Sequence, residues 1–336
     1  MTINFSALQD DWLVLCTSGE LKQRPQAFQL LGQDLVVYRD PHGQVHAFLD
    51  RCPHRNVRLS EGRLCDGLLV CQYHGWEFDT QGRCVKIPGR LAEHDTRAPG
   101  LKKIALQETA GLVFACLGDP GDKPPFLPAV VNDPQYGCDA HANHVAADAK
   151  NIVENFLDPF HTHFVHAGLI RNRSEVQRSL NQIKRRHMPR GFEIEYLTTE
   201  RQTGVLARFA PPIDQAFGRF RLPGIVELDY RTAGVVQFVN CMYITPRTQS
   251  SSSLYFRVFL RRGGLPPRFV FLVAGAIAKR ALKQDQLILE KQTRRALELG
   301  GEFYCNTELD LARRQLDYLY DGSAQQVEFH DLQALI

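Results

Sequence analysis

Two short pairs of cysteine and histidine constrain this chain of 336 residues more than any other feature. One residue separates Cys52 from His54, two separate Cys71 from His74, and 16 residues lie between the pairs. Thiolate sulfur and imidazole nitrogen are ligands that transition metals prefer in proteins. The spacing therefore predicts two neighbouring loops that together hold one metal centre.

Two cysteines and two histidines suit two kinds of centre. In a Rieske [2Fe–2S] cluster, two histidines replace two cysteines on one iron, which raises the reduction potential. The same side chains could close a tetrahedral shell around a structural zinc ion. Each pair here mixes one cysteine with one histidine, whereas zinc motifs usually pair cysteine with cysteine and histidine with histidine. Gly75 also allows a tight turn after His74. We therefore expect the iron–sulfur cluster, with zinc as the alternative.

The stretch from Arg51 to Asp79 contains CPHRNVRLSEG and LLVCQYHGWEFD, and it resembles the Rieske domain of ring-hydroxylating and demethylating oxygenases. Respiratory Rieske proteins differ because each of their ligand loops carries an additional cysteine. Val57 and Tyr73 occupy those positions here. The resemblance therefore implies the Rieske non-heme iron oxygenase family, with these cluster ligands: Cys52, His54, Cys71 and His74. The length of the chain is similar to that of the monooxygenase and demethylase branch of this family.

Composition and charge narrow the class of protein further. The nine cysteines are an odd number scattered along the chain, which favours reduced thiols over a disulfide framework. No secretory signal or apolar run of membrane-spanning length is evident, so we expect a cytoplasmic protein without a membrane partner. A formal net charge of +3 is too small to suggest nucleic acid as a partner.

The pattern of strands and helices predicts an α+β protein with two domains. Short apolar runs and turn signals, such as Asp40–Gly43 and Asp79–Gly82, predict an all-β domain over residues 1–118. Residues 119–336 form the second domain, which begins with the proline-rich connector 119–128. There we expect helices over about 150–166, 271–299 and 305–320, and an antiparallel sheet between 192 and 261. The resemblance implies a helix-grip catalytic domain.

A second metal motif lies on the first of these expected helices. Asp158, His161 and His166 have the spacing D-x2-H-x4-H, and paired imidazoles bind divalent transition metals. Ordinary buried or surface histidines are the alternative. His163 would point about 200° away from His161 on a helix. The segment NIVENFLDPFHTHFVH is similar to the mononuclear Fe(II) motif of the same oxygenases, which implies that His161 and His166 are the iron ligands.

The third ligand has to come from another segment, and Asp285 is the candidate. It lies within an apolar stripe on the long expected helix, formed by Ala278, Ala281, Leu282, Ile288 and Leu289. A buried carboxylate needs a cation, which could be the iron or a basic side chain. Glu290 lies on a different face and is the weaker candidate. The surrounding QDQLILEKQ is similar to the helix that supplies the third ligand in demethylase-type members.

Asp158 is expected to act on the catalytic site without binding the metal. A carboxylate at this distance before His161 can accept its second ring N–H and fix its orientation. The resemblance implies that Asp158 also bridges to the cluster ligand His74 of a neighbouring subunit, which requires a head-to-tail homotrimer. Glu154 and Asn155 would support the ligands, or they are ordinary polar helix residues.

The resemblance also implies the reaction. Electrons would come from NAD(P)H through a separate ferredoxin or flavin-containing reductase, because the chain has no nicotinamide or flavin fingerprint. Together with O2, they would hydroxylate or oxidatively demethylate a small organic substrate of low polarity. A dioxygenase that forms cis-diols, or an electron-transfer protein without oxygenase activity, are the alternatives. The basic residues between 171 and 190 are expected to form a solvated loop, or a lid or docking surface.

Overall fold

The computed structural model describes residues 2–91, 98–170, 180–198, 213–262 and 267–336. The chain forms two compact units. One unit comprises Leu8–Phe126, and the other comprises Met1–Ala7 together with Leu127–Ile336. The chain passes between the units twice, once after Ala7 and once after Phe126, and the second crossing falls within the proline-rich connector that follows Gly118.

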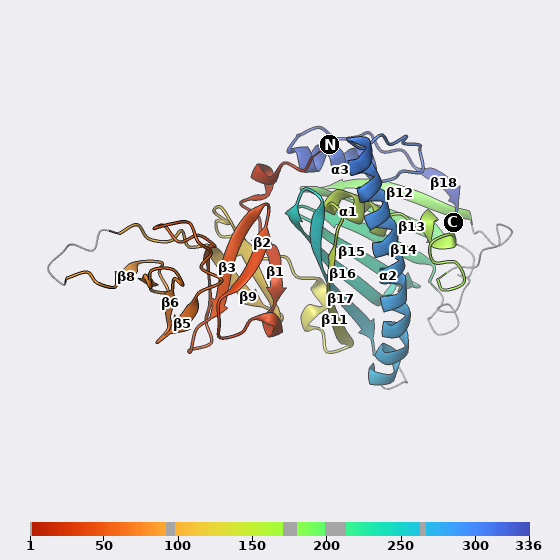
Figure 1. The fold of residues 1–336 in the computed structure, drawn as a ribbon. Coiled ribbons are helices and arrows are strands. Elements are labelled where there is room, and N and C mark those ends of the chain that lie inside the picture. Colours follow the sequence, from red (N-terminus) through yellow and green to blue (C-terminus); the bar gives the residue numbers. More distant parts are fainter. Residues whose placement is uncertain (1, 92–97, 171–179, 199–212, 263–266) are drawn as a thin grey trace. The chain divides into compact units, whose positions relative to one another are not determined.

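The unit Leu8–Phe126 consists of small antiparallel sheets, as the alternation of short strands and turns predicts (Figure 1). In its described residues there are three sheets. Their strands, in sheet order, are β1 (Leu13–Thr17), β10 (Leu112–Cys116) and β9 (Ala105–Thr109); β2 (Gln26–Leu30), β3 (Gln33–Arg39) and β4 (Val45–Leu49); and β5 (Arg63–Cys65), β6 (Leu68–Val70), β7 (Glu77–Phe78) and β8 (Cys84–Lys86). A short 3₁₀ turn lies at Ser18–Glu20, and another, Phe5–Leu8, leads into this unit from the N-terminal residues of the other.

Both predicted turns of this unit are confirmed. The amide of Gly43 donates to the carbonyl of Asp40 between β3 and β4, and Gly82 donates to Asp79 between β7 and β8. Behind the turns, the apolar faces of the strands meet in one buried cluster. The cluster consists of Val36, Tyr38, Phe48, Cys52, Leu59, Leu69, Cys71 and Phe78. Two of the predicted metal ligands therefore lie inside the core of this unit.

The other unit is built on one antiparallel sheet of eight strands (Figure 1). In sheet order the strands are β11 (Tyr136–Val145), β17 (Ser251–Arg261), β16 (Val235–Thr248), β15 (Ile225–Thr232), β14 (Gln215–Arg221), β13 (Gly191–Thr198), β12 (Leu180–Met188) and β18 (Leu332–Leu335). The predicted antiparallel sheet is confirmed, and β18 extends it with a segment near the C-terminus.

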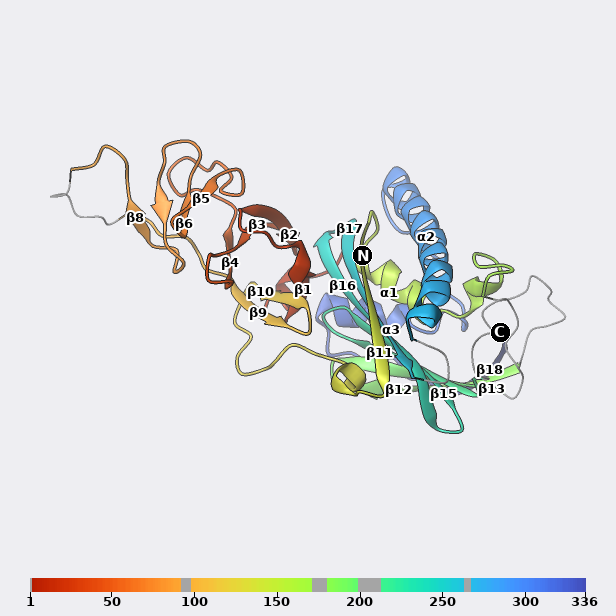
Figure 2. The ribbon, with the colours of Figure 1, turned by 90° about the horizontal axis from the view of Figure 1, so that it is seen from below.

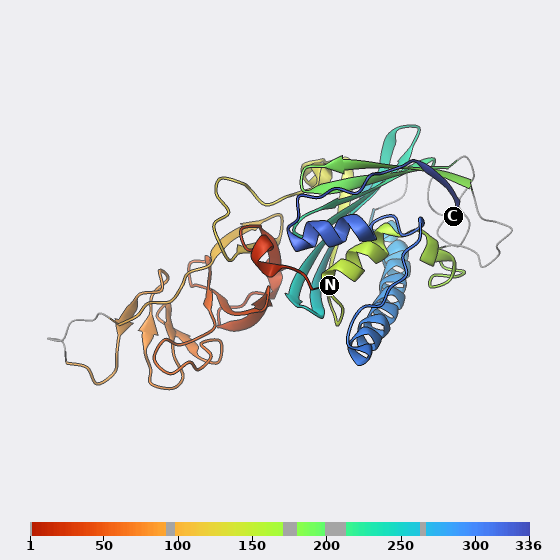
Figure 3. The same ribbon diagram turned by 90° about the horizontal axis from the view of Figure 1, so that it is seen from above.

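Three helices pack on one face of this sheet (Figures 2 and 3). They are α1 (Ala149–Leu157), α2 (Pro267–Leu299) and α3 (Arg313–Asp321), accompanied by 3₁₀ turns at Ala129–Asn132 and Phe160–His163. The helix α1 contacts β14, β15 and β16 as well as both other helices, and α2 contacts β11. This arrangement confirms the α+β prediction and the long helix. None of the described helices combines the length and apolarity that a membrane span needs.

Two predicted helices were wrong in their extent. The helix expected over about 150–166 ends at Leu157, because Asp158 is extended, with φ −88° and ψ 117°. Pro159 explains the break, since proline disfavours helical geometry in the preceding residue. The chain continues as a 3₁₀ turn over Phe160–His163. The helix expected over 305–320 begins only at Arg313.

Candidate metal centres

Two loops with the same backbone geometry carry the first group of predicted ligands. In the loop after β4, the amide of Cys52 donates to the carbonyl of Val57, and that of Asn56 donates to the carbonyl of Cys52. In the loop after β6, the amide of Cys71 donates to the carbonyl of Trp76, and that of Gly75 donates to the carbonyl of Cys71.

Each loop closes with a residue in the left-handed region. Asn56 has φ +62° and Gly75 has φ +69°. Glycine adopts this conformation without strain, and asparagine tolerates it better than most residues. A Cβ at Gly75 would also lie 3.0 Å from Cγ of Pro88. The expected role of Gly75 in a tight turn is therefore confirmed.

In both loops the cysteine is more deeply buried than the histidine. Cys52 and Cys71 are buried in the core cluster, whereas His54 is half-buried and His74 is exposed. The two imidazole rings lie next to each other, with centroids 4.5 Å apart. His54 also stacks on Trp76 at 4.8 Å. One metal ion could thus take both cysteines on the inner side, and a second could take both histidines on the outer side.

The side chains of these loops fit an iron–sulfur cluster. Burial raises the pKa of the Cys52 thiol to about 11, so a thiolate there needs a positively charged neighbour. Burial, His74 and Arg55 lower the pKa of His54, which favours its neutral imidazole. The Nδ1 atom of His54 is buried, and no described residue gives it a hydrogen bond. Such a nitrogen is available to a metal.

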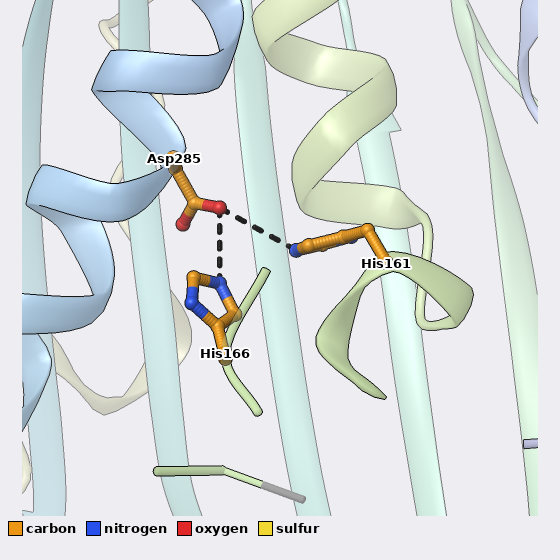
Figure 4. Close-up of side chains that lie close together, drawn as sticks. All are labelled: His161, His166 and Asp285. Atoms are coloured by element: carbon orange, nitrogen blue, oxygen red, sulfur yellow. Dashed lines mark ion pairs between the residues drawn. The ribbon is translucent and has the colours of Figure 1, made fainter. Parts of the chain in front are cut away.

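The second group of predicted ligands converges on one point in the other unit. Asp285 Oδ1 lies 2.9 Å from His166 Nε2 and 3.5 Å from His161 Nε2. One ligand atom from each of the three residues can be chosen so that all lie within 4.8 Å of one another. Figure 4 shows the three side chains pointing toward each other, with Asp285 reaching in from α2. Among the described residues, no other group of three histidine, cysteine or acidic side chains brings its ligand atoms this close together.

Local structure explains how these side chains meet. Asp148 caps α1 by accepting a hydrogen bond from the amide of Asn151. After the break at Pro159, the carboxylate of Asp158 accepts from the amides of Phe160 at 2.7 Å and His161 at 3.3 Å. These bonds hold the short turn that carries His161.

Electrostatics at this site favour a cation. Burial alone would raise the pKa of Asp285, but the hydrogen bonds and charges of His161 and His166 lower it below its ordinary value. Burial alone would lower the pKa of His161, but Asp158 and Asp285 raise it to about 9. Asp285 is 5% exposed and His166 2% exposed. A divalent ion between the three groups would replace the proton that this arrangement attracts.

A buried ion-pair network fastens α1 to the rest of its unit. Arg313 of α3 donates to Asn151 Oδ1 at 2.6 Å, to Glu154 at 3.1 Å and to Glu302 at 2.7 Å. Lys150 donates to Asp317 at 2.7 Å. Buried charges of this kind are costly unless they are paired. The pairs therefore fix the position of α1, and with it the segment that carries Asp158 and His161.

Several other sequence-based expectations can be placed. His163 is buried and is not among the three converging residues. Glu154 turns toward Arg313, and Nδ2 of Asn155 is buried with no hydrogen-bond partner in the described segments.

Ile288 is 43% exposed, so its place in the buried stripe was wrong. Glu290 accepts from Gln286 at 2.7 Å, which leaves it outside the cluster.

The basic stretch between 171 and 190 is only partly a loop. Residues 171–179 lie outside the described residues. Lys184, Arg185 and Arg186 lie on β12, so the expectation of a solvated loop was wrong for them. Arg186 pairs with Glu195 at 3.3 Å across the sheet. This part of the stretch contributes to the sheet rather than to a lid.

Two residues that sequence reasoning missed also shape this site. Gln284, next to Asp285, lies with Oε1 3.0 Å from Nδ1 of His166. Gly218 of β14 lies under the end of α1, where a Cβ would meet Cδ2 of Leu157 at 3.0 Å. The position of Gln284 beside a predicted ligand was a usable signal. Nothing in the sequence pattern marks Gly218.

Comparison with known protein families matches both units. Residues 11–99 match the Rieske [2Fe-2S] domain. Residues 145–324, more than half of the chain, match the vanillate O-demethylase oxygenase C-terminal domain. All predicted cluster ligands and all predicted mononuclear-site ligands lie within these two matches.

Individual relatives agree with these matches. A vanillate O-demethylase oxygenase subunit from Pseudomonas sp. strain HR199 is 33% identical over 165 residues, covering 47% of this chain and 45% of that one. The oxygenase component of dicamba O-demethylase from Stenotrophomonas maltophilia is 35% identical over 164 residues, covering 47% and 48%. The chain thus spans about half the length of the curated relatives it matches. The crystal structure of dicamba monooxygenase bound to dicamba superposes with a TM-score of 0.76 and 25% identity, covering 93% of this chain and 97% of that one.

Proposed function

The chain belongs to the Rieske oxygenase family that shares the vanillate O-demethylase oxygenase C-terminal domain, and we propose that it is the terminal oxygenase component of a Rieske system. The observation that carries this proposal is the convergence of His161, His166 and Asp285 in a chain that also has a Rieske domain. Two histidines and one carboxylate are the ligand set of non-heme Fe(II) oxygenases.

In this proposal each predicted site residue has a role. The [2Fe–2S] cluster would be held by Cys52, His54, Cys71 and His74, and Fe(II) by His161, His166 and Asp285. When bound, the cluster supplies single electrons, and the Fe(II) ion supplies a place where O2 is activated. Asp158 orients His161 and, by resemblance to the family, connects it to His74 of a neighbouring subunit. The carboxylate of Asp285 offsets part of the charge of the metal in a buried setting.

The proposed reaction consumes one O2, two electrons and two protons for each substrate molecule and releases one water. Insertion of one oxygen atom into a C–H bond gives an alcohol. When that carbon is an O-methyl or N-methyl group, the product is an unstable hemiacetal or hemiaminal that breaks down to formaldehyde and the demethylated compound. Electrons would come from NAD(P)H through a separate ferredoxin or flavin-containing reductase, and the protein would work as a cytoplasmic homotrimer.

The sheet offers a surface for an organic substrate. Gly218, Leu228, Asn240 and Val258 are register neighbours across β14 to β17, and Gly218 faces Leu157 of α1. Leu228, Asn240 and Val258 are only half-buried, although they lie on the same face of the sheet as α1. Next to them, the rings of Tyr230 and Phe238 stack at 4.1 Å. A mainly apolar and aromatic floor suits a ring compound of low polarity.

Replacing one proposed iron ligand tests the function. We expect His161→Ala to abolish product formation and substrate-dependent O2 consumption, while the visible spectrum of the cluster stays unchanged because its ligands lie in the other unit. Substrates for the assay come from a screen of methoxylated, N-methylated and polycyclic compounds with NAD(P)H and a ferredoxin reductase. Full turnover by this variant would show that the three-residue site is not the place of reaction.

Labelled O2 separates this reaction from the dihydroxylation alternative. A monooxygenase or demethylase leaves one labelled atom in the organic product and the other in water. Incorporation of both atoms into a cis-diol would instead identify a dioxygenase. Reduction of the cluster without O2 consumption in the presence of any screened compound would favour a pure electron-transfer protein.

A further inference from the structure

Both ring nitrogens of His166 face side chains of α2. Nε2 lies 2.9 Å from Oδ1 of Asp285, and Nδ1 lies 3.0 Å from Oε1 of Gln284. The two partners are consecutive residues, so one turn of one helix contacts the ring on both sides. His166 is 2% exposed, so water has little access to either nitrogen.

This arrangement selects one tautomer for a metal ligand. The Nε2 atoms of His161 and His166 both face Oδ1 of Asp285, which marks Nε2 as the side on which a metal would bind. A metal needs the lone pair on that nitrogen, and the single proton of a neutral imidazole then lies on Nδ1. The Nδ1–H of His166 therefore needs an acceptor, and the side-chain oxygen of Gln284 is at hydrogen-bonding distance.

The two histidines differ in how well this acceptor is placed. Nδ1 of His161 is 3.4 Å from Oδ2 of Asp158, and the same carboxylate already accepts from the amides of Phe160 and His161. The bond between His166 and Gln284 is shorter, at 3.0 Å. Among the described residues, the neutral amide of Gln284 thus lies closer to Nδ1 of His166 than the shared carboxylate of Asp158 lies to Nδ1 of His161.

The neighbouring residue keeps this part of α2 in place. Gln286 accepts from Asn143 of β11 at 3.2 Å and donates to Glu290 at 2.7 Å. Gln286 also donates to the carbonyl of His144 at 3.4 Å. The backbone that carries Gln284 is therefore tied to the edge of the sheet, and Gln284 presents its amide from a fixed position.

We propose that Gln284 is a positioning residue that holds His166 in the tautomer and orientation needed to bind iron through Nε2. This inference rests on the proposed function, because it assumes that the three-residue site binds Fe(II). Outer groups that orient a ligating histidine contribute about 10–100-fold to metal affinity in other proteins. Gln284 contacts neither the metal nor the substrate in this proposal and acts only through His166.

Two substitutions of similar size test the proposal in the full-length protein with its cluster loaded. Gln284→Met removes the acceptor, and Gln284→Glu keeps an acceptor oxygen. The readout is the Fe(II) dissociation constant, measured by chelator competition, together with the visible spectrum of the Co(II)-substituted site. We expect Gln284→Met to weaken Fe(II) binding about 10–100-fold and to change the Co(II) spectrum. Gln284→Glu should keep the wild-type affinity or exceed it.

Controls separate this result from a general effect of substitutions on α2 and from failure of the proposed function. Lys291→Ala, an exposed position on the same helix, should bind Fe(II) like the wild type, and the cluster spectrum reports the state of the other unit. If the wild type binds no Fe(II) at this site, the proposed function itself fails. If the wild type binds Fe(II) and Gln284→Met binds it equally well, or Gln284→Glu loses as much as Gln284→Met, only the role of Gln284 is overturned.

Discussion

The metal-free imidazole of His161 is unusually basic because two carboxylates face it from opposite sides. Asp158 lies near Nδ1 and Asp285 near Nε2, and together they raise the pKa of His161 to about 9 against the opposing effect of burial. A raised pKa in the folded state stabilises the metal-free protein below the ordinary pKa of histidine. This stabilisation is lost as the pH rises through about 9. A proton and the proposed Fe(II) ion would therefore compete for the same nitrogen.

This competition predicts how iron binding depends on pH. The Fe(II) affinity of the wild type should increase as the pH rises toward about 9, since deprotonation of His161 accompanies binding. Asp158→Asn removes the first of the two groups that raise this pKa, so its affinity should level off at a lower pH. Chelator competition over a pH series measures both curves. An affinity that stays constant between about pH 6 and 9 would contradict the prediction.

Most of the side chains proposed as ligands of the two centres could be picked out from the sequence, because close spacing in the chain reflects closeness in a loop or turn. Asp285 could be predicted for another reason, since a lone carboxylate within an apolar stripe needs a cation. Gln284 was not predicted. Its role depends on how the ring of His166 is rotated, and only the packing of α2 against the segment after α1 determines that rotation.

At the scale of secondary structure, the structure contains the expected helices and strands, but their ends and their contacts were harder to predict from the sequence. Alternating apolar residues were sufficient to predict the strands β16 and β17 and the turns of the Rieske unit. The end of α1 was misjudged, although Pro159 already marked it. The close contact between Gly218 and Leu157 could not be predicted, because strand periodicity tells on which face of the sheet a residue lies but not which helix or strand covers that face.

That contact predicts a sensitive position in the sheet. Gly218→Ala would place a Cβ 3.0 Å from Cδ2 of Leu157, whose carbonyl also accepts a hydrogen bond from Tyr196 at 2.7 Å. Displacement of the end of α1 should lower the free energy of unfolding by about 1–3 kcal/mol and weaken Fe(II) binding. Thermal unfolding and chelator competition measure the two effects.

The matched control for this substitution lies in the same unit. Gly301→Ala adds a Cβ whose nearest neighbours, ring atoms of Phe303, are 3.8 Å away at ordinary contact distance. We expect a much smaller effect on unfolding and none on metal binding. Equal effects of the two substitutions would show that the contact below α1 does not position the iron ligands.

At the scale of the whole molecule, the sequence predicts one metal centre in each of two compact units. The cluster loops belong to the unit Leu8–Phe126, and the three converging ligands belong to the unit that contains the large sheet. Ligand spacing could predict these two centres separately, because each motif is local. It could not predict how electrons would pass between them, since the proposed route depends on how chains assemble.

Mixing two inactive variants tests the proposed passage of electrons between neighbouring chains. Cys71→Ser should lack the cluster but keep Fe(II), and His166→Ala should keep the cluster but lack Fe(II). Each variant alone should show no turnover. In co-expressed mixtures, an iron-bearing chain beside a cluster-bearing chain forms a complete route. Random head-to-tail trimers of equal amounts should recover about one quarter of the wild-type activity per chain, because half of the chains hold Fe(II) and half of those have a suitable neighbour.

Mixtures of each variant with the wild type show that the altered chains assemble. Their presence in trimers can be measured by affinity tags on one chain type and by molar mass in solution. If mixed trimers form but show no activity, electrons travel only within a chain, and Asp158 has no bridging role toward His74. Recovered activity that disappears when Asp158→Asn is added to the iron-bearing chain, while that chain still holds Fe(II), would connect the route to that carboxylate, which lies beside His161.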